Sequence, residues 1–507
     1  MLIIANHGNY FWLPLSLSYM LTRLQTRQWD LQKAAHLLNR AGFGGTPDEI
    51  KAFYELGLDK AVQTALDGPD DSAQFPKPSW AQPNNMLEMR QTMMLMTDED
   101  RKAMQQDLQK QYRQEGLDLV NWWLGRMRYS TNPYREKMTL FWHGHFATSV
   151  LKVRESYLMW QQNETLRQHA FGNFGLMVKA ISRDPAMLIW LDTRESRKDH
   201  PNENFARELM ELFTLGIGNY TEQDVQQGAR AFTGYKIDPR DETFRYAPFQ
   251  HDDGVKQFLG KSGAFSGDDA IDIILQQPAC AKFIAKKIWE FYAYQDPRPA
   301  LAEALAWNFR LSSYEIRPLM NTILRSAEFY SPDAVRTQIK SPVQWVVQTS
   351  KVLETPLARP RVTINALRQL GQVPFAPPNV KGWDGGRAWI TTSTLLYRYN
   401  MANFAVGNGP LRIEQVRRVA NTDKSPNRPS FDAMNYQGPD LTKIVPAQVR
   451  SDPKRLVAYL CFRLFQDPLT PRDTETFMKY VTDHGTDDAT LRELLHLMMS
   501  TPQYQLT

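Results

Sequence analysis

The sequence gathers imidazole, carboxylate and guanidinium groups in a few short segments. Imidazoles and carboxylates hold divalent metals and transfer protons in proteins. In the first segment, residues 136–145, a helix would place Glu136 and His143 on one face, and His145 would follow the helix end after Gly144. A carboxylate beside an imidazole suits a metal or proton-transfer site. The alternative is that both histidines belong to an aromatic shell and hydrogen-bond to the backbone.

A second segment, residues 202–212, carries several charged groups on one predicted helix. Helical spacing aligns Glu208 and Glu211 on one face, and Arg207 lies one turn after Glu203. The Glu203–Arg207 pair alone could be an ordinary helix ion pair worth about 0.3–0.5 kcal/mol. Several polar groups facing inward would instead be costly unless they bind a ligand. Both interpretations stay open.

A third group, His251 and Asp252, stands in an aromatic-rich loop together with Asp253, Gly254 and Lys256. It could supply nitrogen and oxygen ligands to a metal, or it could form an exposed turn. Common catalytic motifs are missing from the sequence, including HExxH, the P-loop, GxSxG and paired CxxC. Because no GxGxxG stands between a strand and a helix, we expect no nucleotide or nicotinamide cofactor.

A fourth segment, residues 381–389, combines glycines with two tryptophans and an arginine. Its glycines permit close backbone approach, and Trp383 and Trp389 offer flat stacking faces beside Arg387. This combination suits the binding of a sugar or an anion. The alternative is that a long loop packs onto a helical body.

Composition limits the class of protein. The 507 residues predict about three domains at ~150 residues each. With 42% apolar and 23% charged residues, the chain has ordinary globular usage. The net charge is only +5, and Lys and Arg form no basic stripe in the sequence, so we expect no nucleic-acid partner. Two cysteines exclude a disulfide framework and a cysteine-rich metal site.

The positioning elements are mostly helices. Apolar residues recur at helical spacing after Asp30, a candidate N-cap, and Thr46 with Pro47 opens the next helix. Residues 201–213 predict one helix, and Thr221 begins another. The methionines between residues 86 and 96 lie at helical spacing, which favours core packing over a cofactor site. Residues 235–267 predict a small irregular or β insertion.

The N-terminal residues do not predict a membrane span or an export leader. Residues 3–21 are interrupted by polar residues and Pro14, whereas a span needs about 20 nearly continuous apolar residues. No Lys or Arg precedes Arg23, although a secretory leader begins with a basic region. The chain is predicted to divide into six regions. The first three are an N-terminal extension (1–27), a helical region with the charged motifs (28–234) and the small insertion (235–267). A first helical repeat (268–358), a region with a Trp/Gly/Pro-rich loop, a helix and a polar insertion (359–440), and a second helical repeat (441–507) follow.

The two predicted repeats rest on an internal echo in the sequence. Residues 283–289 match residues 456–462 in apolar pattern, and residues 316–319 match residues 491–494. We interpret this as a duplicated helical subdomain, since two copies are too few for a solenoid. Chance similarity between amphipathic helices is the alternative.

Several longer strings resemble one bacterial family. These strings are residues 35–44, 132–137, 141–146, 202–216 and 379–383. They are similar to the bacterial domain of unknown function 1800, from about residue 29 to the end. The resemblance implies an exported, periplasmic location, although this sequence shows no leader and would otherwise be cytoplasmic. It also implies a gene neighbour that resembles sulfatases or phosphatases, and it carries over no catalytic residues.

The first functional hypothesis is a metal-assisted enzyme, a hydrolase that acts on an extracytoplasmic polymer such as a polysaccharide or its esters. A divalent metal ion would be its cofactor. The expected metal ligands are His143, His145, Glu208, Glu211, His251 and Asp252. The expected catalytic groups are Glu203, Arg207, Glu208 and His145. The expected substrate contacts are Arg135, Trp383, Arg387 and Trp389.

The second hypothesis is a non-catalytic helical protein that binds a polysaccharide or assembles with another protein. Convergence of the ionisable groups on one cavity would favour the enzyme, and separate placement would favour the binding protein. A third possibility is that pairs such as Glu203–Arg207 and Arg135–Glu208 are structural ties. For the fold, we predict a mostly helical body with a duplicated helical subdomain and the small insertion.

Overall fold

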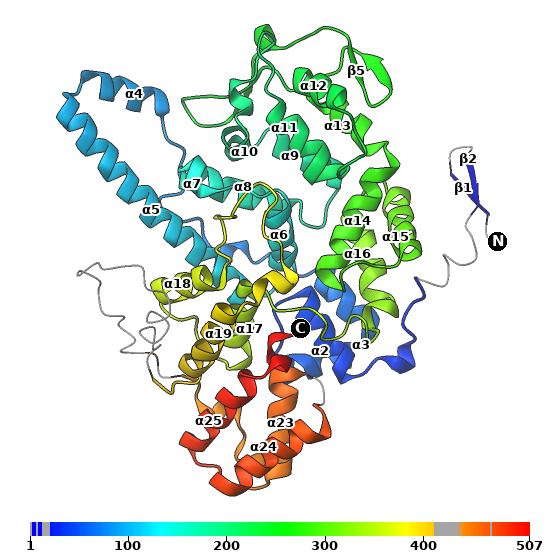
Figure 1. Cartoon of the computed structure of the whole chain (residues 1–507), viewed down its shortest axis with the longest axis vertical. Coiled ribbons are helices and arrows are strands. Elements are labelled where there is room, and N and C mark those ends of the chain that lie inside the picture. The colour runs from blue at the N-terminus through cyan, green and yellow to red at the C-terminus, as the bar shows by residue number, and fades with distance from the viewer. Residues whose placement is uncertain (1–2, 7–8, 13–20, 410–435, 437, 467–468) are drawn as a thin grey trace.

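The computed structural model describes residues 3–6, 9–12, 21–409, 436, 438–466 and 469–507 (Figure 1). In these residues the chain is mostly helical, as the sequence predicts. Most of the polar insertion predicted before residue 440 lies outside the described residues. None of the described helices is both long and apolar enough to cross a bilayer.

Helices of the first half lead to the small sheets. They are α2 (Leu31–Ala41), α3 (Pro47–Leu66), α4 (Met86–Leu95), α5 (Asp98–Tyr129), α6 (Pro133–His145), α7 (Val150–Val153), α8 (Ser156–Gln168), α9 (Phe174–Ser182), α10 (Pro185–Trp190), α11 (Glu203–Glu208) and α12 (Glu222–Ala231). Short 3-10 helices are η1 (Thr26–Gln28), η2 (Ser72–Gln74) and η3 (Thr193–Glu195).

Helices of the second half follow the sheets. They are α13 (Gly267–Leu275), α14 (Pro278–Tyr292), α15 (Pro299–Leu311), α16 (Ile316–Arg325), α17 (Pro342–Val352), α18 (Pro360–Leu370), α19 (Thr392–Ala405), α21 (Leu441–Ile444), α22 (Ala447–Arg450), α23 (Pro453–Phe465), α24 (Pro471–His484) and α25 (Asp488–Met499). Short 3-10 helices here are η5 (Pro248–Gln250), η6 (Glu328–Tyr330), η7 (Gly386–Trp389) and η8 (Pro502–Gln505).

The predicted insertion contains two small antiparallel hairpins. Strand β3 (Tyr235–Ile237) pairs with β4 (Phe244–Tyr246), and β5 (Lys256–Phe258) pairs with β6 (Lys261–Gly263). A third hairpin, β1 (Ile3–Asn6) with β2 (Asn9–Trp12), lies in the predicted N-terminal extension. The small β insertion predicted for residues 235–267 is therefore confirmed.

Side-chain caps fix where several helices begin. Asp30 accepts a hydrogen bond from the Lys33 N–H at the start of α2. Thr46 opens α3 with a reciprocal capping box, and Thr221 does the same for α12. These three helix starts were predictable, because capping depends on residues that are neighbours in the sequence.

The single helix predicted for residues 201–213 is wrong in one respect. Helix α11 ends at Glu208, and residues Leu209–Thr214 form the wider π-helix η4. The Thr214 hydroxyl donates to the Leu209 carbonyl inside this turn. A π-helix changes the angular spacing of successive side chains, so the face shared by Glu208 and Glu211 is not that of a regular α-helix.

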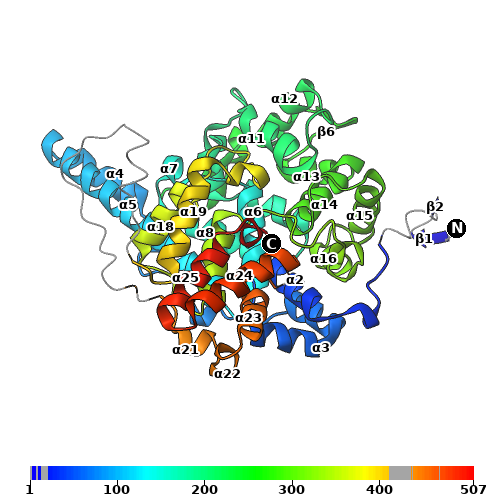
Figure 2. The same cartoon turned by 60° about the horizontal axis from the view of Figure 1, so that its bottom comes forward.

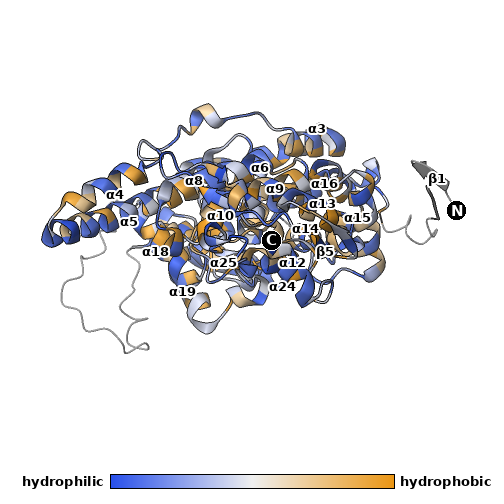
Figure 3. Ribbon diagram, turned by 90° about the horizontal axis from the view of Figure 1, so that it is seen from above, coloured by the Kyte–Doolittle hydropathy of each residue, from blue (hydrophilic) through white to orange (hydrophobic). Residues whose placement is uncertain are grey.

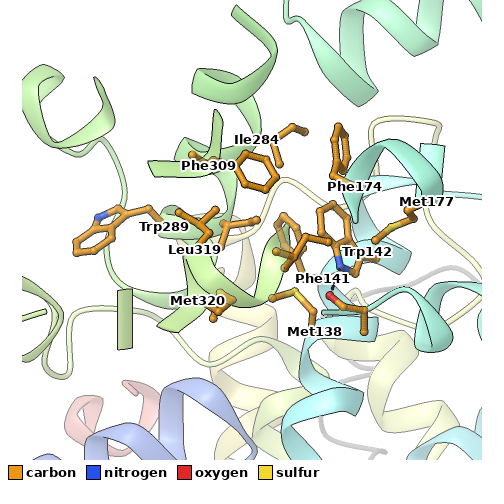
Figure 4. Close-up of a cluster of buried hydrophobic side chains, with 14 of the residues drawn as sticks. Met138, Phe141, Trp142, Phe174, Met177, Ile284, Trp289, Phe309, Leu319 and Met320 are labelled. Atoms are coloured by element: carbon orange, nitrogen blue, oxygen red, sulfur yellow. Dashed lines mark hydrogen bonds between the residues drawn. The ribbon is translucent and has the colours of Figure 1, made fainter. Parts of the chain in front are cut away.

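Two clusters of buried apolar side chains form the interior. The first joins α2, α3, α6, α9 and α14–α16, and the second joins α5, α17–α19 and α23–α25. Figure 4 shows Trp142 of α6 in the first cluster, where its indole N–H donates to the Ala170 carbonyl at 3.0 Å. Leu140, also on α6, belongs to the second cluster. Helix α6 therefore connects the two halves of the core.

Helices α4 and α5 form an arm that projects from this body (Figures 1 and 2). The core position predicted for the methionines of residues 86–96 is wrong, because no residue of α4 is buried. Met94 and Leu95 are 78% and 90% exposed. The helical spacing was correct, but the methionines Met86, Met89, Met93 and Met96 are only half-buried. Figure 3 shows apolar residues along the arm, away from the body.

The predicted repeats contain the same order of elements. Helices α14, α15 and α16 lead into η6, and helices α23, α24 and α25 lead into η8. At equivalent positions, the Ser326 hydroxyl accepts from the Phe329 N–H and the Thr501 hydroxyl accepts from the Tyr504 N–H. Gene duplication as the origin of this likeness stays a prediction.

A buried ion network joins α5, α6 and α8. The Glu136 carboxylate, 1% exposed, accepts from Arg126 Nε at 3.1 Å and from Arg167 Nε at 2.7 Å. The Trp123 indole N–H donates to the same carboxylate at 2.8 Å. Burial acts to raise the pKa of Glu136, but the Arg167 and Arg126 charges and these hydrogen bonds outweigh it and lower the pKa. Three helices thus meet at one charged centre.

We predict that Glu136→Gln costs on the order of 3 kcal/mol of unfolding free energy, because it removes the carboxylate that two buried guanidinium groups share. Arg126 would keep only Asp71, at 3.7 Å, and Arg167 only Glu164 as a charge partner. Chemical denaturation measures this loss. Glu203→Gln is the matched control, since it breaks a half-exposed i,i+4 pair with Arg207 and should cost about 0.5 kcal/mol or less. Equal losses in the two variants would contradict a special role for the network.

Candidate functional site

His143, a predicted metal ligand, supports a neighbouring loop. Its Nε2 accepts a hydrogen bond from the Phe375 N–H at 2.9 Å. The ring packs against Trp123 and Trp383 at centroid distances of 5.0 and 5.9 Å. Burial lowers the pKa of His143 to about 3, so the imidazole is neutral and uses the Nε2 lone pair for this backbone contact.

His145 takes a different partner from His143. Its Nε2 lies 3.0 Å from the Phe213 carbonyl, which can only accept, so this nitrogen carries the proton. Burial, and then the nearby positive charge of Lys287, lower the pKa of His145 well below its ordinary value. Nδ1 is buried and has no hydrogen-bond partner among the described residues. The ring connects α6 to the π-helix η4.

The loop residues His251 and Asp252 are also engaged. His251 Nδ1 lies 2.9 Å from the Thr233 carbonyl. Asp252 forms a two-point ion pair with Arg230, with distances of 2.7 and 3.0 Å. The hydrogen bond from Arg230 is the main reason why the pKa of Asp252 is lowered. This cluster holds the insertion against the C-terminal end of α12.

Charged residues of the second predicted segment pair with one another and with residues at the start of α12. Arg207 bonds to Glu203 at 3.3 Å and to Glu222 at 2.7 Å. Burial, and then the charge of Glu211, raise the pKa of Glu208. Glu211 in turn accepts from the Tyr220 hydroxyl at 2.6 Å. The described residues show no Arg135–Glu208 pair, the tie predicted as an alternative.

The predicted ligands therefore serve separate local contacts. His143, His145 and His251 each bond to a different backbone segment, while Glu208 and Glu211 influence each other. Across the described ranges, no group of three or more His, Cys, Asp or Glu side chains could hold a metal ion. The geometry thus shows separate placement instead of one shared cavity.

The predicted substrate contacts pack mainly against the body. Trp389 is 7% exposed, and the half-buried Trp383 faces the His143 ring. Gly382 has φ +85°, and a Cβ atom at this position would lie 2.3 Å from the Gly144 carbonyl oxygen. The close approach of the loop to the end of α6 requires this glycine. Arg387 is exposed, and Arg135 is half-buried.

A cavity that the sequence analysis missed lies at the base of the arm. Its volume is about 410 Å³, and it is formed by the middle of α5, helix α7 with the following residue, helix α18 and the loop after it. The lining residues include apolar side chains, glutamine, one tyrosine and three arginines. The residues that carry its chemistry are Tyr112, Arg113, Arg154, Ile364, Arg368 and Pro374.

The three arginines of the cavity have no counter-ion among the residues that the structure describes. Arg113, Arg154 and Arg368 come from three different segments and are all exposed. Within the described chain their guanidinium groups form no ion pair or side-chain hydrogen bond. None of the residues found to line the cavity is acidic. The cavity therefore presents positive charge beside apolar walls.

The cavity wall contains two non-glycine residues with positive φ. Arg154 has φ +68° and ψ −32°, and Phe375, between the lining residues Pro374 and Ala376, has φ +64°. Such conformations cost of order 1–3 kcal/mol and persist where surrounding contacts impose them. Here the Val150 N–H donates to the Phe375 carbonyl at 2.8 Å, and His143 accepts the Phe375 N–H. Both polar backbone groups of Phe375, its N–H and its carbonyl, are thus held by hydrogen bonds.

A carboxyl pair lies beside the same cavity. Burial, and then a hydrogen bond with Glu242, raise the pKa of Glu155 to about 9. Glu242 is 1% exposed, and its Oε2 accepts the Asn84 N–H at 2.8 Å. Its Oε1 is buried and has no other hydrogen-bond partner among the described residues. This pair joins the residue after Arg154 to the root of the arm.

One comparison with known proteins gives a match. The model of the family described as protein of unknown function DUF1800 matches residues 36–506. The chain belongs to this family. No curated protein matches the chain, and no solved structure does. We therefore infer the function of this DUF1800 member from its own site.

We predict that His143→Leu lowers the unfolding free energy at neutral pH by about 1–3 kcal/mol, because the buried Phe375 N–H loses its acceptor. His143→Gln, which offers an acceptor and cannot be protonated, should retain more stability. In the parent protein the His143 contribution is complete above its ordinary pKa of 6.5 and is lost as the pH falls toward 3. Denaturation at several pH values should show a smaller acid loss in His143→Gln, and an unchanged loss would contradict this role.

A second pH dependence follows from the carboxyl pair. Unfolded Glu155 loses its proton near its ordinary pKa of 4.5, whereas the pKa of the folded group is raised to about 9. The stability that it contributes is complete below 4.5 and is lost as the pH rises toward 9. Glu155→Gln should remove on the order of 2 kcal/mol of this alkaline decline. Glu99→Gln, exposed on α5, is the control, and equal declines in both variants would refute the shared proton.

Proposed function

We propose that this DUF1800 member is a non-catalytic protein-binding or assembly protein, and that the arm and the cavity at its base form its docking surface. The cavity carries the proposal. It combines three unpaired arginines with apolar walls, and the described residues that line it include no carboxylate, imidazole, lysine or thiol. Such a lining can hold an acidic, partly apolar partner but offers few groups for acid–base or nucleophilic catalysis.

The exposed end of the arm supports the same proposal. Leu87, Met94 and Leu95 of α4 are 44%, 78% and 90% exposed. Methionine and arginine are enriched in the buried parts of protein interfaces, and exposed apolar groups often mark interaction sites. The arm and the cavity are continuous through helix α5, which extends from Asp98 beside α4 to the cavity residues Tyr112 and Arg113.

Two other functions have less support. A metal-assisted hydrolase would need groups that the structure engages elsewhere, such as His143 with the Phe375 backbone and Asp252 with Arg230. A polysaccharide-binding platform at Trp383 and Trp389 would need exposed indole faces, and these rings pack largely against the protein. Protein binding requires neither free metal ligands nor exposed indole faces.

The first partner to test is the sulfatase- or phosphatase-like product of a neighbouring gene, which the family resemblance implies. The two proteins should co-elute when they are expressed together. The double variant Met94→Ser with Leu95→Ser should abolish co-elution, because it removes exposed apolar area from the arm. Leu311→Ser, at a 42% exposed position on α15, is the matched control and should co-elute normally.

Two results would contradict this function. One is that the neighbouring product does not co-elute, or does so equally with the arm variant. The other is that the purified protein hydrolyses a polysaccharide ester and loses this activity in Glu208→Gln, which would favour the enzyme.

A further inference from the structure

We propose that the cavity at the base of the arm binds an acidic segment of the partner protein. Carboxylates of this segment would pair with Arg113, Arg154 and Arg368, and an apolar side chain between them would enter the cavity. The inference rests on the proposed protein-binding function and adds the chemistry of the ligand.

Charge complementarity carries the first step. Arginine is suited to carboxylates because its planar guanidinium group donates two parallel hydrogen bonds. Within the described chain, no nearby acidic group forms an ion pair with any of the three arginines. On α5, Asp118 accepts from Gln114 and the buried Glu115 accepts from Gln111. For Glu155, next to Arg154, burial and then its hydrogen bond with Glu242 raise the pKa to about 9.

The cavity walls carry the second step. Ile364 and Val150 contribute apolar surface from two helices, and Pro374 contributes it from the loop. A volume of about 410 Å³ lies in the range of sites that bury small molecules, and it has room for side chains of a docked segment. An inorganic anion alone would leave these apolar walls uncovered. An acidic segment with apolar residues would cover both the charged and the apolar parts.

The lining favours a peptide over an acidic polysaccharide. Tyr112 is the one aromatic side chain found to line this cavity, and it is half-buried, so the site offers little stacking surface for sugar rings. The cavity is also continuous with the exposed arm, which suits a partner larger than the cavity itself.

Backbone contacts hold the wall of the cavity in a defined conformation. Positive φ values at Arg154 and Phe375 are imposed by contacts on both sides of the wall, including the His143 acceptor. A rigid wall reduces the entropy that binding must remove, and this preorganisation favours affinity. His143 thus acts as a positioning residue for the cavity.

The test uses fluorescence anisotropy with the full-length protein and three short labelled peptides. The first alternates Glu with Leu, the second replaces every Glu with Gln, and the third replaces every Glu with Lys. We expect the Glu peptide to bind at least about tenfold more tightly than the Gln peptide and to weaken with added salt, and we expect no binding of the Lys peptide. Equal binding of the Glu and Gln peptides would overturn the inference.

Variants locate the binding. Replacing Arg113, Arg154 or Arg368 singly by Ala should weaken the Glu peptide about fivefold, and the triple variant should weaken it on the order of 100-fold. Arg361→Glu changes the charge on the same helix, α18, at an exposed position that does not line the cavity, and it should have no effect. Circular dichroism should show an unchanged melting temperature for the single variants. Unchanged peptide binding in the triple variant would overturn the inference.

An acidic oligosaccharide, oligogalacturonate, tests the other class of ligand. If it binds more tightly than the Glu peptide and depends on the same arginines, the acidic-peptide occupant is wrong. Different results would refute the proposed protein-binding function and the proposed acidic ligand of the cavity. Co-elution that depends on the arm but not on the three arginines would preserve the proposed function and refute this inference. Loss of arm-dependent co-elution would refute the proposed function, whatever the peptide does.

Discussion

The buried Glu136 carboxylate is the contact on which the arrangement of the site depends. Arg126 of α5 and Arg167 of α8 bond to it, so three helices have fixed positions around one charge. Each of these helices leads to the cavity. Helix α5 carries Arg113, α6 ends near His143, and α8 begins after Arg154. A buried ion group of this kind adds little net stability when complete, but it is costly to break. Its role here is to hold the helices in one arrangement.

The two conspicuous histidines of α6 each use one ring nitrogen for a backbone contact. An imidazole in an apolar shell stays neutral, and a neutral ring has one donor and one acceptor. His143 uses its acceptor for the Phe375 N–H, and His145 uses its donor for the Phe213 carbonyl. The aromatic residues around them were visible in the sequence. They favoured the alternative of a structural shell, which for His143 is what positions the cavity wall.

The sequence predicts what depends on neighbours along the chain. Helix starts at Asp30 and Thr46 followed from capping, and the small hairpins followed from composition. It could not predict contacts between distant segments. Arg113 and Arg154 are separated by α6 and α7, Arg154 and Arg368 are separated by the helices from α8 to α17, and no motif connects them. The methionines of α4 show the same limit, because helical periodicity identifies an apolar face but not whether another element covers it.

Protection from chemical modification shows whether an acidic ligand occupies the three arginines at the base of the arm, which pair with no acidic group of the described chain. Phenylglyoxal modifies accessible guanidinium groups, and mass spectrometry locates each modified arginine. With the acidic peptide bound, we expect protection of Arg113, Arg154 and Arg368 and unchanged modification of the exposed Arg361. Unchanged modification of all three, or protection confined to Arg387 in the tryptophan loop, would contradict it.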